Sequence, residues 1–102
     1  MRMLMTVQME VEAANRAIRD GSWAQTMERV MTDLQPEAAY FTTRDGKRTG
    51  YVVFDLKEPS DMPAIAEPFF MGVGASVDMS PCMTVADVQV GLEKAAAAFA
   101  PA

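Results

Sequence analysis

The chain has 102 residues, which is enough for a single domain, residues 1–102, with one hydrophobic core. Its composition, 50% hydrophobic and 23% charged, is globular, and its apolar runs are too short for a spanning helix or a signal peptide, so we expect a soluble, cytoplasmic protein with no membrane partner. The formal net charge of -5 opposes the phosphates of nucleic acids and excludes them as expected partners.

The first predicted strand is Arg2–Glu10, where the character of the residues alternates. Odd-numbered positions are uniformly apolar, whereas even-numbered positions grade from apolar Leu4 to acidic Glu10. Successive side chains of a strand point to opposite faces, so one face should belong to the core and the other should be partly exposed. We expect this strand to lie in the centre of a sheet that is covered on both faces.

Helical spacing of apolar residues follows over Val11–Leu34, with a break at the turn tripeptide Asp20-Gly21-Ser22. Ser22 and Gln25 have the spacing of a capping box, which predicts that a second helix begins at Trp23. The segment should end before Pro36, because the residue before a proline favours an extended conformation.

Two strand-like segments, Ala38–Thr43 and Thr49–Leu56, are rich in aromatic and β-branched residues. Between them lies the pair Asp45-Gly46, which readily adopts the positive φ angles of a tight turn. The sequence therefore predicts a β-hairpin, with the even-numbered apolar residues of its second strand on one face and the odd-numbered ones on the other.

A third helix is expected over Asp61–Met71, with Ser60 as its N-cap. Pro68 lies too deep in this segment to belong to the first turn. Because a proline inside a helix removes a hydrogen bond, we expect the helix to kink or end near this residue.

Alternation over Ala75–Met83 predicts a fourth strand, with Pro81 marking a sheet edge or bulge. Thr84 and Asp87 then have the spacing of a capping box that opens a last helix. The apolar stripe of this helix consists of Val85, Val88, Leu92, Ala95, Ala96 and Phe99. Its alanine-rich tail through Ala102 is expected to fray.

The predicted element order is β-α-β-β-α-β-α, which defines an α+β fold of the ferredoxin-like, split βαβ type. Right-handed crossovers give a four-stranded antiparallel sheet in the order 4-1-3-2 with the helices on one face. The face without helices is mixed in character and large for a small monomer, so we expect two copies to pair through it as a homodimer. This face should carry Leu4, Thr6, Gln8, Tyr40, Tyr51, Val53, Asp55, Ser76 and Asp78.

The order and patterning of the elements resemble the dimeric α+β barrel superfamily, whose members pair ferredoxin-like sheets face to face. Three segments, Arg19–Ser22, Glu37–Phe41 and Ala66–Phe69, are also similar to small bacterial proteins of unassigned function. The function we expect is that of a binding module for a small apolar molecule, or of an accessory module that only dimerises. The alternative that the resemblance implies is a cofactor-free oxygenase or isomerase acting on an aromatic or polyketide-like substrate.

The chain contains no histidine, and Cys82 is its only cysteine. These absences exclude Ser-His-Asp and Cys-His catalysis and a Cys-rich zinc site, so we predict no metal and no cofactor, and an inert Cys82. If the protein is an enzyme, the expected catalytic residues are Asp55, Asp78 and Tyr51, with Tyr40 as a further proton carrier. The carboxylates could act only if burial or a like charge raised their pKa.

A small-molecule site, if present, should lie where the break between the first helices and the Pro68 irregularity meet over the apolar sheet face. Its expected lining is Met5, Val7, Trp23, Phe54, Phe69 and Phe70, with Arg16 and Glu67 at a polar mouth. The competing interpretation is that these apolar side chains, like most of the ten methionines, are simply packed core.

Overall fold

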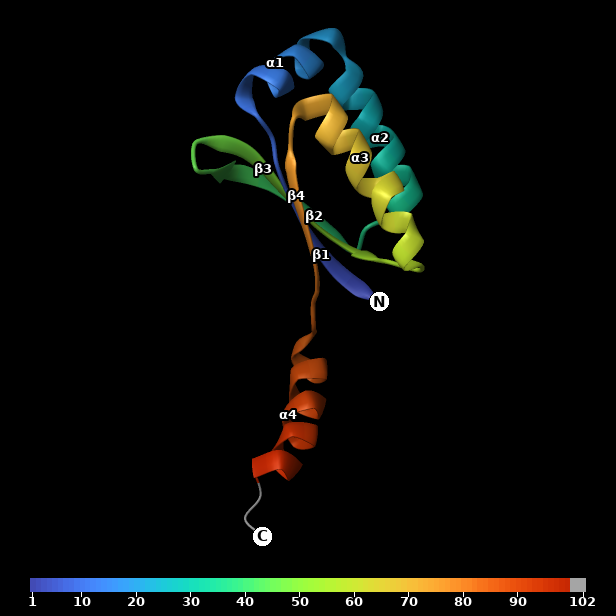
Figure 1. The fold of residues 1–102 in the computed structure, drawn as a ribbon, viewed down its shortest axis with the longest axis vertical. Coiled ribbons are helices and arrows are strands. Elements are labelled where there is room, and N and C mark those ends of the chain that lie inside the picture. The colour runs from blue at the N-terminus through green and yellow to red at the C-terminus, as the bar shows by residue number, and fades with distance from the viewer. Residues whose placement is uncertain (100–102) are drawn as a thin grey trace.

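The computed structural model describes residues 1–99 as a small α+β domain from which one helix projects (Figure 1). The tail through Ala102, expected to fray, lies partly outside the described residues. In chain order the elements are β1 (Arg2–Gln8), α1 (Val11–Asp20), α2 (Ser22–Leu34), β2 (Ala38–Arg44), β3 (Lys47–Asp55), the single 3-10 turn η1 (Pro59–Asp61), α3 (Met62–Val73), β4 (Ser76–Pro81) and α4 (Val85–Phe99).

The four strands form one sheet in the order β2-β3-β1-β4, and every neighbouring pair is antiparallel. This is the predicted order 4-1-3-2 read from the other edge, so the expected topology is confirmed. The arrangement is compatible with a ferredoxin-like fold. It places β1 between β3 and β4, in the centre of the sheet as predicted, but within residues 1–99 only one of the two faces of β1 is buried, not both.

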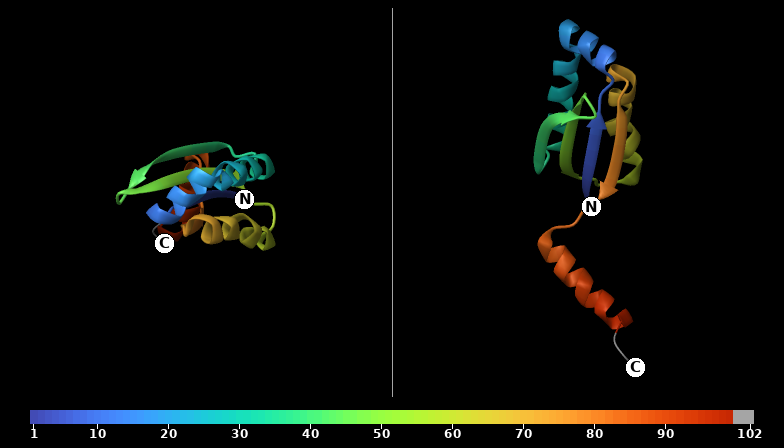
Figure 2. Two further views of the ribbon diagram at one scale, coloured as in Figure 1. Left: turned by 90° about the horizontal axis from the view of Figure 1, so that it is seen from above. Right: turned by 90° about the vertical axis from the view of Figure 1, so that its left-hand side faces the viewer.

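One face of the sheet is covered by α2 and α3, with α1 across the end at which β1 finishes, and this side contains the core (Figures 1 and 2). Met5 and Phe54, from the two central strands, are the most completely buried of the large apolar side chains, at 0% and 1% exposed. The buried apolar residues are Met3, Met5, Val7, Met9, Ala14, Ala17, Val30, Val52, Phe54, Leu56, Phe69, Val73 and Ala75. Several of the methionines therefore fill the core.

The hairpin between β2 and β3 closes in fewer residues than expected, because the strands pair up to Arg44 and Lys47. Only Asp45 and Gly46 remain in the turn, with φ angles of 56° and 73°. Positive φ at both positions is the signature of a type I′ turn, whose twist matches that of the flanking strands. The predicted hairpin is confirmed, with a tighter turn.

Of the predicted helix caps, only the one at α4 forms. The Thr84 N–H donates to Asp87 Oδ2 at 3.0 Å, and the Asp87 N–H donates to Thr84 Oγ1 at 3.1 Å, which makes a reciprocal capping box. The cap predicted at Ser22 is wrong, because Ser22 is already the first residue of α2 and follows the left-handed Gly21. The cap predicted at Ser60 is also wrong, since Ser60 lies within η1.

The helix α3 continues through Pro68 to Val73, so of the two predicted outcomes, a kink or an end near this proline, the end is wrong. The proline removes one backbone hydrogen bond, a defect that costs about 3 kcal/mol in a helix interior. Phe69 and Val73 beyond it are both buried at 2% exposure, and their burial offsets the loss.

An unpredicted cap holds α1 to the end of β1. Glu10 Oε1 accepts from the Glu12 N–H at 3.0 Å, and Oε2 accepts from the Ala13 N–H at 2.6 Å. These two backbone hydrogen bonds lower the pKa of Glu10 below its usual value, and the bond from Ala13 makes the larger contribution. The backbone N–H of Glu10 also donates to the Val73 carbonyl at 3.1 Å, so this residue ties β1, α1 and α3 together.

Glu10→Ala is expected to lower the melting temperature at neutral pH and to have little effect in acid. A carboxylate whose pKa is depressed on folding stabilises the protein above its unfolded pKa of about 4.3, and this contribution disappears as the pH falls through the folded pKa. Thermal melts of both proteins across this range should therefore converge at low pH. Glu12→Ala, which removes a first-turn glutamate but leaves the cap, is the control; an equal loss there, or a pH-independent gap for Glu10→Ala, would contradict the assignment.

The helix α4 departs from the expectation that the helices share one face of the sheet. It projects from the end of β4, away from α1 to α3 (Figures 1 and 2), and contains no buried residue. The radius of gyration is accordingly 17.1 Å, against about 13 Å for a compact domain of this length. The expectation fails because α2 and α3, together with α1 at one end, already cover the apolar sheet face. None of the helices within residues 1–99 has the length and apolar character needed to cross a membrane.

Candidate functional site

The face of the sheet opposite α1 to α3, which we call the open face, is the first candidate site (Figure 2, right). Strand register aligns Tyr40, Tyr51, Thr6 and Asp78 in one row that crosses all four strands. The next row, towards the N-terminal end of β1, contains Ala38, Val53, Leu4 and Ser80. The face therefore has a polar row with two tyrosines beside a more apolar one.

Hydrogen bonds order the hairpin end of the open face. Arg44 Nη1 donates to the Tyr51 hydroxyl at 3.2 Å, and this bond raises the pKa of the arginine above its usual value. The Gln8 side-chain amide donates to the Arg44 carbonyl at 3.0 Å and to Asp45 Oδ2 at 3.2 Å. These contacts position Tyr51 beside a fixed cation.

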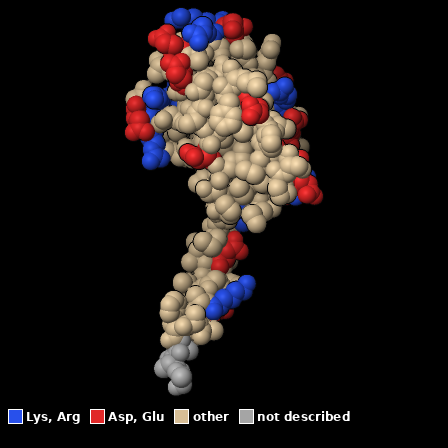
Figure 3. All heavy atoms as spheres, in the orientation of Figure 1, with Lys and Arg blue, Asp and Glu red and all other residues tan. Residues whose placement is uncertain are grey.

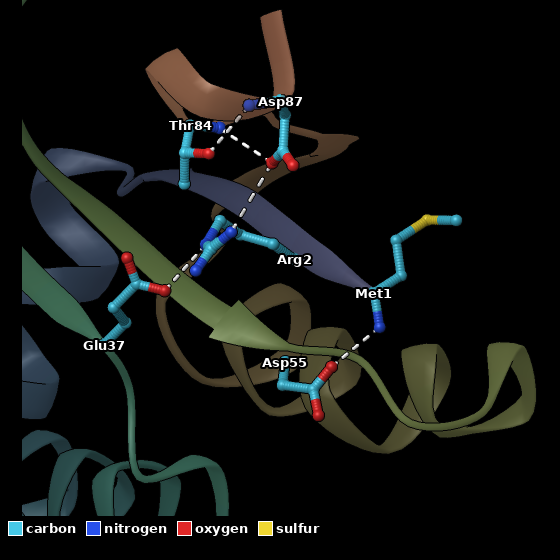
Figure 4. A network of polar contacts seen from close by, with 6 residues as sticks. All are labelled: Met1, Arg2, Glu37, Asp55, Thr84 and Asp87. Atoms are coloured by element: carbon cyan, nitrogen blue, oxygen red, sulfur yellow. Dashed lines mark hydrogen bonds and ion pairs between the residues drawn. The ribbon is translucent and has the colours of Figure 1, made fainter. Parts of the chain in front are cut away.

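Ion pairs occupy the other end of the open face (Figure 4). Arg2 Nε lies 2.7 Å from Glu37 Oε1, and Arg2 Nη1 lies 3.8 Å from Asp87 Oδ2. The Met1 amino group lies 2.7 Å from Asp55 Oδ1. Because it donates a hydrogen bond and carries a positive charge, this ammonium lowers the pKa of Asp55.

The predicted catalytic residues are therefore only partly brought together. Asp78 and Tyr51 share a row, but Asp55 aligns with Arg2, four positions along β1 from Thr6 and roughly 13 Å away along the strand. The Asp55 side chain is also 65% exposed, and its pKa moves opposite to the direction that acid–base catalysis at neutral pH requires.

The predicted ligand-binding residues separate into core and surface. Met5, Val7, Phe54 and Phe69 are buried in the core. Trp23 packs against Phe69, with ring centroids 6.2 Å apart and planes tilted by 57°. By contrast, Phe70 is 42% exposed, and Arg16 and Glu67 are also exposed on the surface.

Trp23 does line a cavity, but with different neighbours from those expected. This hairpin cavity, about 440 Å³ in volume, lies between α2 and the β2–β3 hairpin. Its lining residues are Met9, Trp23, Met27, Phe41, Thr42, Arg48 and Thr49. At one side, Arg48 Nη2 donates to Asn15 Oδ1 at 2.9 Å, which holds this cation beside the apolar walls.

Of the seven lining residues only Trp23 was predicted, and Phe41 is the one aromatic wall residue among the six that were not. Its ring lies over Gly50, its partner on β3: a Cβ atom at Gly50 would come within 2.9 Å of the ring. The glycine therefore leaves room for the aromatic side chain to lie across the strand, and a larger residue at this position would require the ring to shift. The sequence contains the information that pairs these two residues, because the tight Asp45-Gly46 turn places Phe41 opposite Gly50.

A second cavity, of about 310 Å³, lies between α2 and α3 at the end of β3. It is lined by Arg29, Val30, Asp33, Leu34, Gln35, Asp55, Leu56, Lys57, Asp61, Ala64, Ile65 and Pro68. Charges of both signs surround its apolar floor, so an apolar ligand there would have to desolvate several ionised groups.

Within residues 1–99, no cluster of His, Cys, Asp or Glu side chains is arranged to hold a metal ion. Cys82 is a free, half-buried thiol. In comparisons with known proteins, no protein-family model matches the chain and no curated protein matches its sequence. The open face and the hairpin cavity are therefore the two features of the molecule that bear on its function.

Proposed function

We propose that this protein is a homodimeric module that binds a small apolar molecule in the hairpin cavity. The observation that supports this function is the cavity itself, with Met9, Trp23, Met27 and Phe41 among its walls. Aromatic rings and thioethers provide a large, adaptable apolar surface. Binding sites for small molecules commonly combine such walls with a few placed polar groups, here Arg48 and the neighbouring threonines.

The position of Arg48 narrows the class of ligand. Arg48 lines the cavity, and its guanidinium donates one hydrogen bond to Asn15. A guanidinium has donors left for a carboxylate, sulfonate or carbonyl after one hydrogen bond is made. The favoured ligand is therefore a largely apolar, aromatic-sized molecule with one acceptor group at its end.

The dimer in this proposal is formed through the open face. Leu4 and Val53 are only partly buried there, and Tyr40 is 73% exposed. A two-fold axis would place the same mixed surface of two copies together, remove these side chains from water and close the paired sheets into a barrel.

Binding at the hairpin cavity can be tested with the fluorescent probe anilinonaphthalene sulfonate, which is aromatic and carries one anionic acceptor. We expect it to change the emission of Trp23, the only tryptophan. Phe41→Ala should weaken binding at least about tenfold, because losing a buried aromatic contact costs about 1.5–3 kcal/mol. The wild-type protein and the variant are compared by titration.

Phe70→Ala is the matched control, since Phe70 is a partly exposed phenylalanine that lies on α3 and does not line the hairpin cavity. Its affinity for the probe should equal that of the wild type. A loss of affinity in Phe70→Ala with none in Phe41→Ala would move the site to α3 and contradict the proposal.

The second candidate function, a cofactor-free oxygenase or isomerase, is favoured by the row Tyr40-Tyr51-Thr6-Asp78. In a sheet-to-sheet dimer this row would be enclosed, so that two phenol hydroxyls and one carboxyl group would face a site shielded from water. Conversion of an aromatic or polyketide-like substrate by the purified protein is the observation that would establish it.

A further inference from the structure

The helix α4 has an apolar stripe, and among the described residues none of the side chains of this helix is buried. Val85, Val88, Leu92, Ala95 and Phe99 recur at alternating intervals of three and four, which is the heptad spacing of a two-stranded helical seam. Val85 is 78% exposed, Leu92 64% and Phe99 81%.

The charged residues of α4 lie off this stripe. Asp87, Glu93 and Lys94 occupy heptad positions on the outer side of such a seam. In Figure 3 the uncharged surface of α4 fills one side of the helix, and the charged atoms lie along the other. The stripe is therefore neutral and complementary to a copy of itself.

A helix of this kind needs a partner. The helix α4 has 15 residues, and isolated helices of about 12–15 residues are marginal in water. Gly91 in its middle weakens it further. Only its first turn is held, by the Thr84–Asp87 capping box and the Arg2–Asp87 ion pair.

The open face alone is smaller than the interface of a stable dimer. Strands about 4.8 Å apart and about seven residues long span a face of roughly 440 Å², whereas a stable dimer buries about 800 Å² on each partner. The stripe of α4 adds roughly 220 Å², from a rise of 1.5 Å per residue and a contact width of about 10 Å. The two surfaces together come close to the area that a stable dimer needs.

The two surfaces are also continuous. Arg2 at the end of β1 holds the start of α4 through Asp87, and the Cys82 N–H donates to the Arg2 carbonyl at 3.1 Å. From there α4 continues along the long axis of the molecule, beyond the end of the sheet (Figures 1 and 2). A two-fold axis along this direction, between two open faces, would bring both copies of α4 side by side and parallel.

We propose that α4 pairs in parallel with α4 of a second copy of this chain, through the stripe Val85 to Phe99, as an extension of the sheet-to-sheet dimer. The inference rests on the homodimer of the proposed function and adds the direction of its two-fold axis. If that axis ran across the strands instead, the two α4 helices would point in opposite directions and could not contact each other.

Disulfide trapping in the full chain tests this pairing. In a Cys82→Ser background, Leu92→Cys puts a thiol on the stripe, and Glu93→Cys puts one on the outer side. Parallel pairing brings the two Leu92 positions near the Cα separation of about 4.4–6.8 Å that a disulfide needs, so Leu92→Cys should crosslink at least about tenfold faster than Glu93→Cys.

Sedimentation of the unmodified chain and of both variants under reducing conditions distinguishes the α4 pairing from the sheet-to-sheet dimer. Dimers with fast crosslinking at Leu92→Cys support the pairing. Dimers in which the two variants crosslink equally slowly overturn the α4 pairing and leave the sheet dimer standing. Monomers of the unmodified chain at micromolar concentration overturn both.

Discussion

Phe54→Ala is expected to remove about 3–5 kcal/mol from the free energy of unfolding, the largest loss we anticipate from a single substitution. Phe54 is 1% exposed, lies on the central strand β3 and pairs with Met3 of β1. The loss combines the lost burial of the ring with the cavity left beneath the helices. Since the free energy of unfolding of a small domain is about 5–15 kcal/mol, a large part of it would be lost in this variant.

Denaturation in urea, followed by circular dichroism, measures this effect. Phe70→Ala deletes the same side chain from a position that is 42% exposed, and it should cost less than about 1 kcal/mol. Equal losses in the two variants would mean that the core is not centred on the sheet face beneath α1 to α3.

Val53→Lys is expected to prevent formation of the proposed dimer. Val53 lies on β3 between Ala38 and Leu4, in the apolar row of the open face. In the proposed dimer each copy would place an unpaired ammonium against the partner sheet, where burial of an unsatisfied charge is strongly unfavourable. We expect the dissociation constant to rise at least about 100-fold, the equivalent of about 2.7 kcal/mol.

Sedimentation equilibrium at micromolar concentration would detect this change. Ala24→Lys adds the same charge to an exposed position on α2, within the helical layer, and should leave the dimer intact. If the wild type and both variants sediment identically, the open face is not the interface. Because Val53 is only half-buried in the single chain, the variant should remain folded, which circular dichroism can check.

The strands and the hairpin could be predicted from the sequence because their determinants are local, and the rule of right-handed crossovers then gave the strand order. Alternation in Arg2–Gln8 gave β1 its two faces, and Asp45-Gly46 fixed the register of the hairpin. The caps were less predictable, because several side chains compete for the same backbone groups. Ser22 matched a capping pattern, yet the left-handed Gly21 starts α2, whereas Glu10 caps α1 although glutamate is not a favoured N-cap.

The candidate site was harder to predict, because it depends on which element covers which surface. Phe41 forms a wall of the hairpin cavity only because its partner across the hairpin is Gly50. Alternation along β3 predicts that Asp55 lies on the open face, but the pKa of this carboxyl depends on the amino group of Met1, which alternation does not reveal. The stripe of α4 was visible in the sequence, but an amphipathic pattern does not reveal whether its partner belongs to the same chain.

The central position of β1 has a consequence for biosynthesis. β1 pairs with Lys47–Asp55 and Ser76–Pro81. The backbone groups on both sides of β1 therefore stay unpaired until these segments have been synthesised. At about 5–20 residues per second, the delay is on the order of seconds to tens of seconds. During this time the methionine-rich strand is an unpaired apolar segment, the kind of sequence that chaperones bind. The nascent hairpin β2–β3, which closes locally, can form first and then serve as the template on which β1 docks.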